Sequence, residues 1–195
     1  MTASSTRRRS REHVEDALIA AAADLLGEIG PRAVSVRMIA ERAGVNHGLV
    51  HHYFGGKAEL LRAAMTRLVE EHRDFATEKS GGRAVPAPLA LAEDQRYLRA
   101  VVRAVLDGDE ELATTELSTG YSIPRAALEH LATKRQMLEP DLDTKAKVAM
   151  EMALEMGWAA LEPFILAVVD VHGDDVAVIR DMVRRRRVHL PAPTS

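Results

Sequence analysis

The chain has 195 residues, a formal net charge of -3 and a hydrophobic fraction of 47%, which is enough apolar material for a buried core. It contains no cysteine, so disulfide frameworks, thiolate metal sites and cysteine nucleophiles are excluded. No apolar h-region follows the basic N-terminus, and no uninterrupted apolar run of about 18 residues occurs anywhere. The sequence therefore predicts an unsecreted, cytoplasmic protein that does not enter a membrane.

The N-terminal segment, residues 1–10, is rich in arginine, and we expect a flexible basic arm there. Two interpretations stay open, a solvated tail or an arm that reaches DNA phosphates or a minor groove. Apolar residues then recur at helical spacing over about 18 residues. They are Val14, Leu18, Ala21, Leu25 and Ile29. Gly30 and Pro31 end this first predicted helix.

Two short helices are predicted next. Ser35 is a good N-cap for a helix over Val36–Ala43, and a glycine follows it. Asn46 is a good N-cap for a third helix from about His47 to Phe54, which a glycine pair closes. Two short helices joined by a tight glycine turn, behind a longer amphipathic helix, are typical of a helix-turn-helix. We place this domain at residues 11–56.

The rest of the chain also has helical periodicity, with a loop at residues 80–88 as the best linker candidate. Helices are expected at about residues 57–79, 93–106, 110–117, 124–138, 144–171 and 174–189. No strand-like alternation of useful length occurs. The predicted fold is all-α with about nine helices, in which a larger helical domain follows the N-terminal one.

The third predicted helix has one face for the core and one for a partner. At 100° per residue, Val50, Tyr53 and Phe54 cluster on the side that should bury. Gly48 and His52 point away from that side. Gly48 allows close approach to DNA, and imidazole N–H groups can bond phosphates or base acceptors. This face is therefore suited to a DNA major groove.

The segment SVRMIAERAGVNHGLVHHYFGGKAELL, residues 35–61, resembles the DNA-binding domain of the TetR family of bacterial transcriptional regulators. The shared pattern is A-G-V, a capping polar residue, a small residue, two central positions, an aromatic pair and a lysine before an apolar helix start. The resemblance covers the first quarter to third of the chain. It implies a homodimer whose two third helices bind an inverted-repeat operator. It also implies that a small ligand releases this dimer from the DNA. It also implies a repressor with no catalytic activity and no cofactor.

The same resemblance assigns the DNA contacts by position. They are Arg37 in the second helix, His47, Gly48, Leu49, His51, His52 and Tyr53 in the third, and Lys57 at the start of the fourth. Family members often have a hydroxyl residue at Leu49, a tyrosine at His51 and a pair such as Pro-Ser at Gly55 and Gly56. Leu49 would then contact a thymine methyl, and His51 would make a shorter contact. The operator sequence therefore does not transfer from a relative.

Residues 57–190 are expected to bind the ligand and the partner, with residues 57–79 as a connecting helix. The candidate ligand contacts are bulky apolar or aromatic residues: Phe75, Tyr97, Tyr121, Met137, Met152, Met156, Trp158 and Phe164. The same residue types also fill cores, so that interpretation stays open. His72 and His130 are candidate polar anchors. The expected effector is a mostly apolar molecule with one or two polar groups.

The last two predicted helices supply dimerisation in the family. Small residues keep one side of the penultimate helix slim: Ala149, Ala153, Gly157 and Ala160. An intermolecular four-helix bundle and an intramolecular core are both compatible with this pattern. The arginine run at residues 184–187 is interpreted as complementing the dipole of the last helix rather than binding nucleic acid.

Two other function classes are compatible with parts of the sequence. His47 and His51, four residues apart, have the spacing of zinc ligands, but no carboxylate or cysteine lies near them in the sequence. An all-helical small-molecule-binding or interaction module without specific DNA binding is the main alternative. Arg37, the third helix and Lys57 favour the DNA-binding regulator over both.

Overall fold

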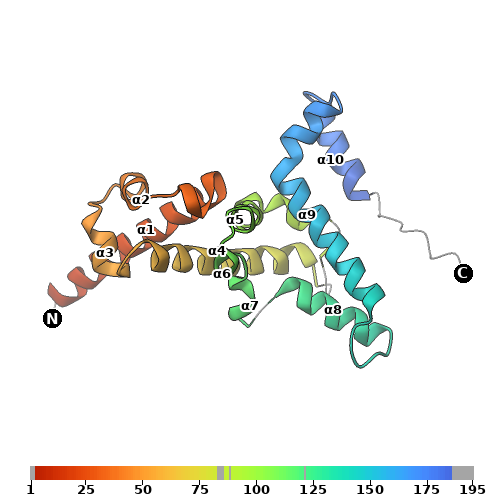
Figure 1. Ribbon diagram of the computed structural model, residues 1–195, viewed down its shortest axis with the longest axis horizontal. Helices are drawn as coiled ribbons and strands as arrows, with labels where there is room; N and C mark the ends of the chain where they lie inside the picture. Colours follow the sequence, from red (N-terminus) through yellow and green to blue (C-terminus); the bar gives the residue numbers. More distant parts are fainter. Residues whose placement is uncertain (1–2, 83–85, 88, 121, 186–195) are drawn as a thin grey trace, which may run out of the picture.

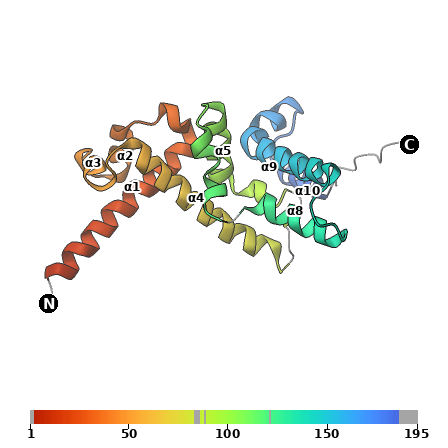
Figure 2. The ribbon, with the colours of Figure 1, turned by 60° about the horizontal axis from the view of Figure 1, so that its bottom comes forward.

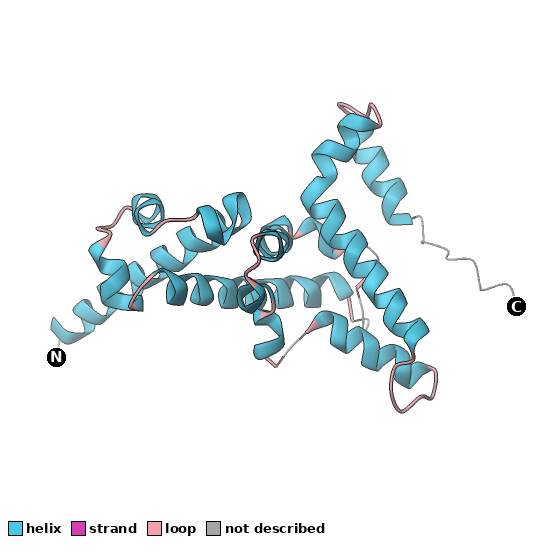
Figure 3. Ribbon diagram, viewed as in Figure 1, coloured by secondary structure: helices cyan, strands magenta, loops and turns pink. Residues whose placement is uncertain are grey.

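The computed structural model describes residues 3–82, 86–87, 89–120 and 122–185, with side chains from residue 11 onward except that of Arg184. Over these residues it contains ten α-helices, one 3-10 helix and no strand (Figure 3). The predicted all-α fold is confirmed. The helices are α1 (Ala3–Ala33), α2 (Val36–Ala43), α3 (Gly48–Phe54), α4 (Lys57–Ser80), η1 (Leu91–Glu93), α5 (Gln95–Leu106), α6 (Glu110–Ala113), α7 (Thr115–Ser118), α8 (Ile123–Lys134), α9 (Leu142–Val168) and α10 (Asp175–Arg185).

Helix α1 differs from its prediction at the N-terminal end. Its backbone is helical from Ala3, so residues 3–10 form its first turns where the sequence predicts an irregular arm. Residues 3–10 contain neither glycine nor proline, so nothing in them interrupts a helix. At the other end, Gly30 has φ 80° and ψ 163°, which breaks the helix before Pro31 as predicted.

The caps of α2 and α3 explain the bounds of these helices. The Ser35 hydroxyl oxygen accepts the N–H of Met38 at 3.2 Å, and Gly44 ends α2 in the left-handed region. Helix α3 begins at Gly48, one residue later than predicted, and its N-cap position is occupied by His47 rather than Asn46. The Asn46 side chain still stabilises this turn, because its Oδ1 accepts the Gly48 N–H at 2.8 Å.

The single helix predicted over residues 110–117 is two short helices, α6 and α7. Thr114 separates them with a backbone of φ -100° and ψ 13°, outside helical values. Its hydroxyl and its backbone N–H both donate to the Glu110 carbonyl, at 2.7 and 3.0 Å.

The helices form two groups joined by α4 and α5. Helices α1–α3, which we call the N-terminal unit, lie at one end, and helices α8–α10, the C-terminal unit, lie at the other (Figure 1). Helix α4 runs from α3 toward α8 as one rod, with α5 packed across it and against α1 (Figure 2). Fully buried side chains of α1, α2 and α4 share one core, including Leu18, Leu26, Ile39, Leu60 and Leu68.

Polar contacts fix the end of α1 against α5. The Arg103 guanidinium donates to the Gly27 carbonyl at 3.0 Å, and the Asp107 carboxylate accepts the Arg32 N–H at 2.9 Å. A Cβ at Gly30 would lie 2.7 Å from an Asp107 carboxylate oxygen. A side chain at this position would displace the Asp107 carboxylate, and the positive φ of Gly30 by itself favours glycine. This junction joins the N-terminal unit to the rest of the chain.

Candidate nucleic-acid interface and ligand cavity

Helix α3 presents one polar face to solvent and buries the other. Val50 has no exposed surface, and Phe54 packs against the same core. His47, His51 and His52 are exposed. Burial of the apolar face thus leaves the imidazoles outward, at the free end of the molecule (Figure 1).

Three further candidate positions of α3 also lie at its surface. Gly48 is exposed, and a Cβ built there meets only the Asn46 side chain, at 3.2 Å. Leu49 is half-buried. Tyr53 is half-buried too, because it packs against the core, and the Arg11 guanidinium lies 5.4 Å from its ring centre. The outward surface of α3 is therefore flat near Gly48 and aromatic near Tyr53.

Two basic residues flank α3. Arg37 on α2 has a side chain 84% exposed and forms an ion pair with Glu41 at 2.7 Å. An exposed pair of this kind costs little to open, so Arg37 can exchange Glu41 for a phosphate or a base. Lys57 is the first residue of α4, where the helix dipole also attracts anions. Together these groups make the surface around α3 suited to a polyanion.

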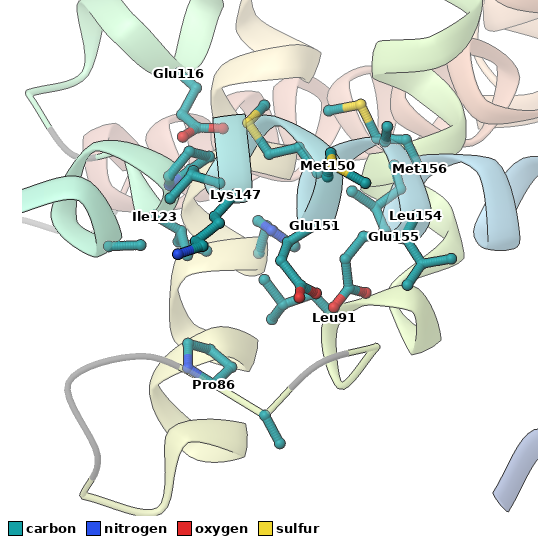
Figure 4. A pocket seen from close by; sticks show the side chains of 18 of the residues that line it. Pro86, Leu91, Glu116, Ile123, Lys147, Met150, Glu151, Leu154, Glu155 and Met156 are labelled. Atoms are coloured by element: carbon teal, nitrogen blue, oxygen red, sulfur yellow. The ribbon is translucent and has the colours of Figure 1, made fainter. Parts of the chain in front are cut away.

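A second feature is a cavity of about 1050 Å³ between α4, α5, α7, α8 and α9 (Figure 4). Most of its lining is apolar, as in small-molecule sites. Of the candidate ligand contacts, Tyr97, Met152 and Met156 line it. The other candidates lie elsewhere or outside the described residues. The Lys79 ammonium lies 5.2 Å from the centre of the Phe75 ring, and the Trp158 indole N–H donates to Glu162 at 2.9 Å. Phe164 is 67% exposed, and neither Met137 nor His130 lines the cavity. Tyr121 lies outside the described residues.

One wall of the cavity is a chain of polar contacts. The His72 ring on α4 lies 2.7 Å from the Asp94 carboxylate through Nδ1 and stacks on the Tyr97 ring at 4.1 Å. The Tyr97 hydroxyl donates to Oε2 of Glu116 on α7. Burial raises the pKa of Tyr97, with the Glu116 charge acting in the same direction, so this hydroxyl stays a donor. His72, a predicted polar anchor, therefore does line the cavity.

Glu155 on α9 is a second titratable group of the cavity with a raised pKa. Burial raises the pKa of Glu155 to about 7, although backbone N–H groups of Ala92, Leu89 and Leu91 act against that shift. Its Oε2 is buried without a hydrogen-bond partner among the described residues. Glu155 and Glu116 are absent from the sequence-based candidates. Only Glu155 has a sequence signal, because it lies on the same face of α9 as Met152 and next to Met156.

Other classes of site find no support in the described part of the chain. There, no group of three or more His, Cys, Asp or Glu side chains is arranged to hold a metal ion, and His47 and His51 have no third ligand. Within the same residues, no helix has the length and apolar character that crossing a membrane requires.

Comparison with known proteins gives matches over both the short motif and nearly the whole chain. The family described as bacterial regulatory proteins, tetR family, matches residues 18–64. The HTH-type transcriptional repressor Rv3405c of Mycobacterium tuberculosis is 32% identical over 179 residues, which are 90% of this chain and 89% of that protein. The HTH-type transcriptional regulator Mb3439c of Mycobacterium bovis matches to the same extent.

Among solved structures, a tetR-family transcriptional regulator from Streptomyces coelicolor has a similar fold. Its TM-score is 0.54 at 24% sequence identity, and the match covers 92% of each chain. This likeness therefore extends beyond α1–α4 to the helices around the cavity.

Proposed function

Because the chain belongs to the tetR family of bacterial regulatory proteins, we propose that it is a one-component transcriptional repressor. In this proposal it binds an inverted-repeat DNA operator as a homodimer. A small, mostly apolar molecule in the cavity releases it. Residues 11–56 read the operator, and residues 57–190 bind the ligand and the second copy.

The observation that carries DNA binding is the outward face of α3. It is short, free of acidic side chains and exposed, and Arg37 and Lys57 flank it. A helix with this surface fits the major groove, which is about 12 Å wide. His47, Leu49, His51, His52 and Tyr53 are proposed to face the groove, with Gly48 allowing the backbone to approach.

Dimerisation is supported by apolar side chains that the described part of the chain leaves uncovered on α9 and α10. Those in the second half of α9 and on α10 are Leu161, Phe164, Val168, Val178 and Met182. An exposed apolar surface shared by two adjacent helices is typical of a protein interface. A second copy that pairs the same two helices would form a four-helix bundle with two-fold symmetry, which matches an inverted-repeat operator.

Ligand release is supported by the position of α4. This helix begins at Lys57 beside α3 and carries His72 into the cavity wall. A rod of 24 residues spans about 36 Å, so a shift of α4 at the cavity also moves its N-terminal end. A ligand that prefers one position of α4 would change the population of the DNA-binding state.

Selection of bound sequences from random DNA with purified protein tests the proposal. We expect enrichment of an inverted repeat and a loss of affinity of about 10³-fold between 50 and 200 mM salt, because several cationic groups meet phosphates. Lys57→Ala should weaken binding to all sequences about equally, whereas Arg37→Ala should also relax the sequence preference.

The matched control is Arg125→Ala, which removes an arginine from α8, far from α3, and should leave DNA affinity unchanged. Failure to enrich any sequence, with the protein folded and dimeric, would instead favour a helical ligand-binding module without specific DNA binding.

A further inference from the structure

We propose that the cavity takes an uncharged, mostly apolar molecule with a hydroxyl group, and that this hydroxyl donates a hydrogen bond to Nε2 of His72. The inference rests on the proposed function, in which this cavity is the ligand site. It adds the chemical class of the ligand and names the group of the chain that binds its polar end.

The His72 ring is held in one orientation in the cavity wall. Its Nδ1 lies 2.7 Å from Oδ2 of Asp94, and it stacks on the Tyr97 ring with the two ring centres 4.1 Å apart. Asp94 is fixed in turn, because its Oδ1 accepts the Tyr97 N–H at 3.3 Å at the start of α5. A turn of the imidazole would therefore break the bond to Asp94.

The contact with Asp94 also determines which ring nitrogen carries the proton. A carboxylate accepts hydrogen bonds and donates none, so Nδ1 of the neutral His72 ring is the donor. The other nitrogen, Nε2, is then an acceptor. Within the described chain, His72 forms this one hydrogen bond, and Nε2 has no donor.

A molecule in the cavity can reach Nε2. Two unpaired side-chain atoms of the described chain are fully buried, Oε1 of Glu116 and Oε2 of Glu155, and a ligand cannot touch them. Nε2 of His72 is unpaired but is not closed off in this way, although the residue as a whole is buried. Because His72 lines the cavity, the surface that Nε2 retains opens into it.

The other polar side chains of the lining are engaged or lie at the surface. The Tyr97 hydroxyl donates to Glu116, and the Lys147 ammonium forms an ion pair with a carboxylate of its own helix at 2.7 Å. Glu151 is exposed. Among the described side chains, Nε2 of His72 is thus a buried, unpaired and reachable acceptor of the cavity.

The surroundings of Nε2 favour an uncharged donor. Most of the lining is apolar, and Leu91, Ile123 and Met156 border this space from three elements (Figure 4). A hydroxyl has one O–H, which matches one acceptor. An ammonium has three N–H groups, so two would stay unpaired in apolar surroundings, which weakens binding. A carboxylate has no proton to donate and would place an acceptor against an acceptor.

Isothermal titration calorimetry of the full-length protein with octanol and its isomer methyl heptyl ether tests the inference. The two probes have the same atoms and similar shapes, but octanol alone has an O–H to donate. We expect octanol to bind about tenfold more tightly, because the ether leaves Nε2 unpaired. In a cavity without a reachable acceptor the ether would bind more tightly, since it gives up fewer hydrogen bonds with water.

Two variants remove Nε2 in different ways. His72→Phe keeps a ring that can stack on Tyr97, and His72→Asn keeps an N–H donor for Asp94. Each should abolish the preference for octanol, while binding of the ether shows that the cavity is intact. His130→Phe is the matched control, because His130 is exposed on α8 outside the cavity lining, and it should leave both affinities unchanged.

Several outcomes would overturn the inference. They are equal affinity of the two isomers for the native protein, tighter binding of the ether, and no measurable binding of either. A preference for octanol that persists in both His72 variants would also overturn it, because the hydroxyl would then bind elsewhere.

Operator binding, measured in parallel by fluorescence anisotropy of labelled DNA, separates this inference from the proposed function. Absence of operator binding in the ligand-free protein would reject the repressor, whereas the ratio of the two affinities would still decide the role of His72. Equal affinity of the isomers with operator binding intact would reject the hydroxyl ligand and retain the repressor.

Discussion

The N-terminal and C-terminal units bury their apolar residues to very different extents. Helix α1 alone contributes Leu18, Ala22 and Leu26 to the core without any exposed surface. In α9, a helix of 27 residues that is more apolar than α1, Ala159 is the member of the main buried cluster, while Phe164 and Val168 are each 67% exposed. The difference does not arise from composition, because both helices have ample apolar residues.

The contrast indicates which interactions each unit needs. The N-terminal unit completes its core with α4 and α5 of the same chain, which gives α3 a rigid support. In the C-terminal unit, α8 and α9 line a cavity together with α4, α5 and α7, and α9 and α10 leave an apolar surface exposed. We infer that a ligand and a second copy of the chain supply its remaining stabilisation. Their binding then shifts the positions of the helices that they contact.

The largest expected effect compares one leucine in each unit. Leu26→Ala removes a side chain with no exposed surface and should lower the free energy of unfolding by about 2–5 kcal/mol at every protein concentration. Leu161 is 52% exposed, so Leu161→Ala should act through dimerisation. Its effect on chemical unfolding should therefore depend on protein concentration.

Chemical denaturation at low and high protein concentration, with sedimentation to follow association, measures both variants. A concentration-independent loss for Leu161→Ala as large as that for Leu26→Ala would contradict the contrast between the two units, since both leucines would then belong to cores within one chain.

A smaller effect is expected from the pH dependence of Glu155. Burial raises the pKa of Glu155 from about 4.5 to about 7, so the folded state holds this proton more tightly than the unfolded state. The resulting stability is fully present below pH 4.5 and is lost as pH rises through 7. Between pH 5.5 and 8 this amounts to about 2 kcal/mol.

Glu155→Gln should remove that loss. The free energy of unfolding of the variant should therefore rise relative to that of the native protein as pH increases from 5.5 to 8. Urea unfolding at several pH values measures the difference between the two proteins. Four other titratable groups line the same cavity: His72, Glu116, Lys147 and Glu151. Subtracting one stability–pH profile from the other removes the contribution that these groups make to both proteins. Parallel profiles would contradict the buried state of Glu155.

The bounds of several helices follow from local signals in the sequence. Ser35 and Gly44 flank α2 as its caps, and both ends of that helix are predicted correctly. Thr114 shows the limit of such signals. Its residue type does not exclude helix, and the break between α6 and α7 appears only in its folded backbone, with φ -100° and ψ 13°.

The cavity was less predictable than the surface of α3. Helical periodicity alone assigns Val50 inward and His52 outward, because that face is set within seven residues. Residue type, by contrast, selects Phe75 and Trp158 together with Tyr97, although only Tyr97 lines the cavity. The unpaired oxygens of Glu116 and Glu155 depend on how α7, α9 and the segment before α5 pack, which periodicity does not encode.

The smallest expected effect on stability lies at the junction between the two regions. Asp107→Ala removes the bond from the Arg32 N–H to α5, and an exposed hydrogen bond of this kind contributes about 1 kcal/mol. Because the bond joins α1 to the end of α5, its loss should reduce the coupling free energy between ligand and operator by no more than about 1 kcal/mol. Operator affinity measured with and without a releasing ligand gives that coupling.

Asp16→Ala, which removes an exposed carboxylate of α1 within the N-terminal unit, is the control and should leave the coupling unchanged. Equal coupling in both variants would show that the two units communicate through α4 without this junction.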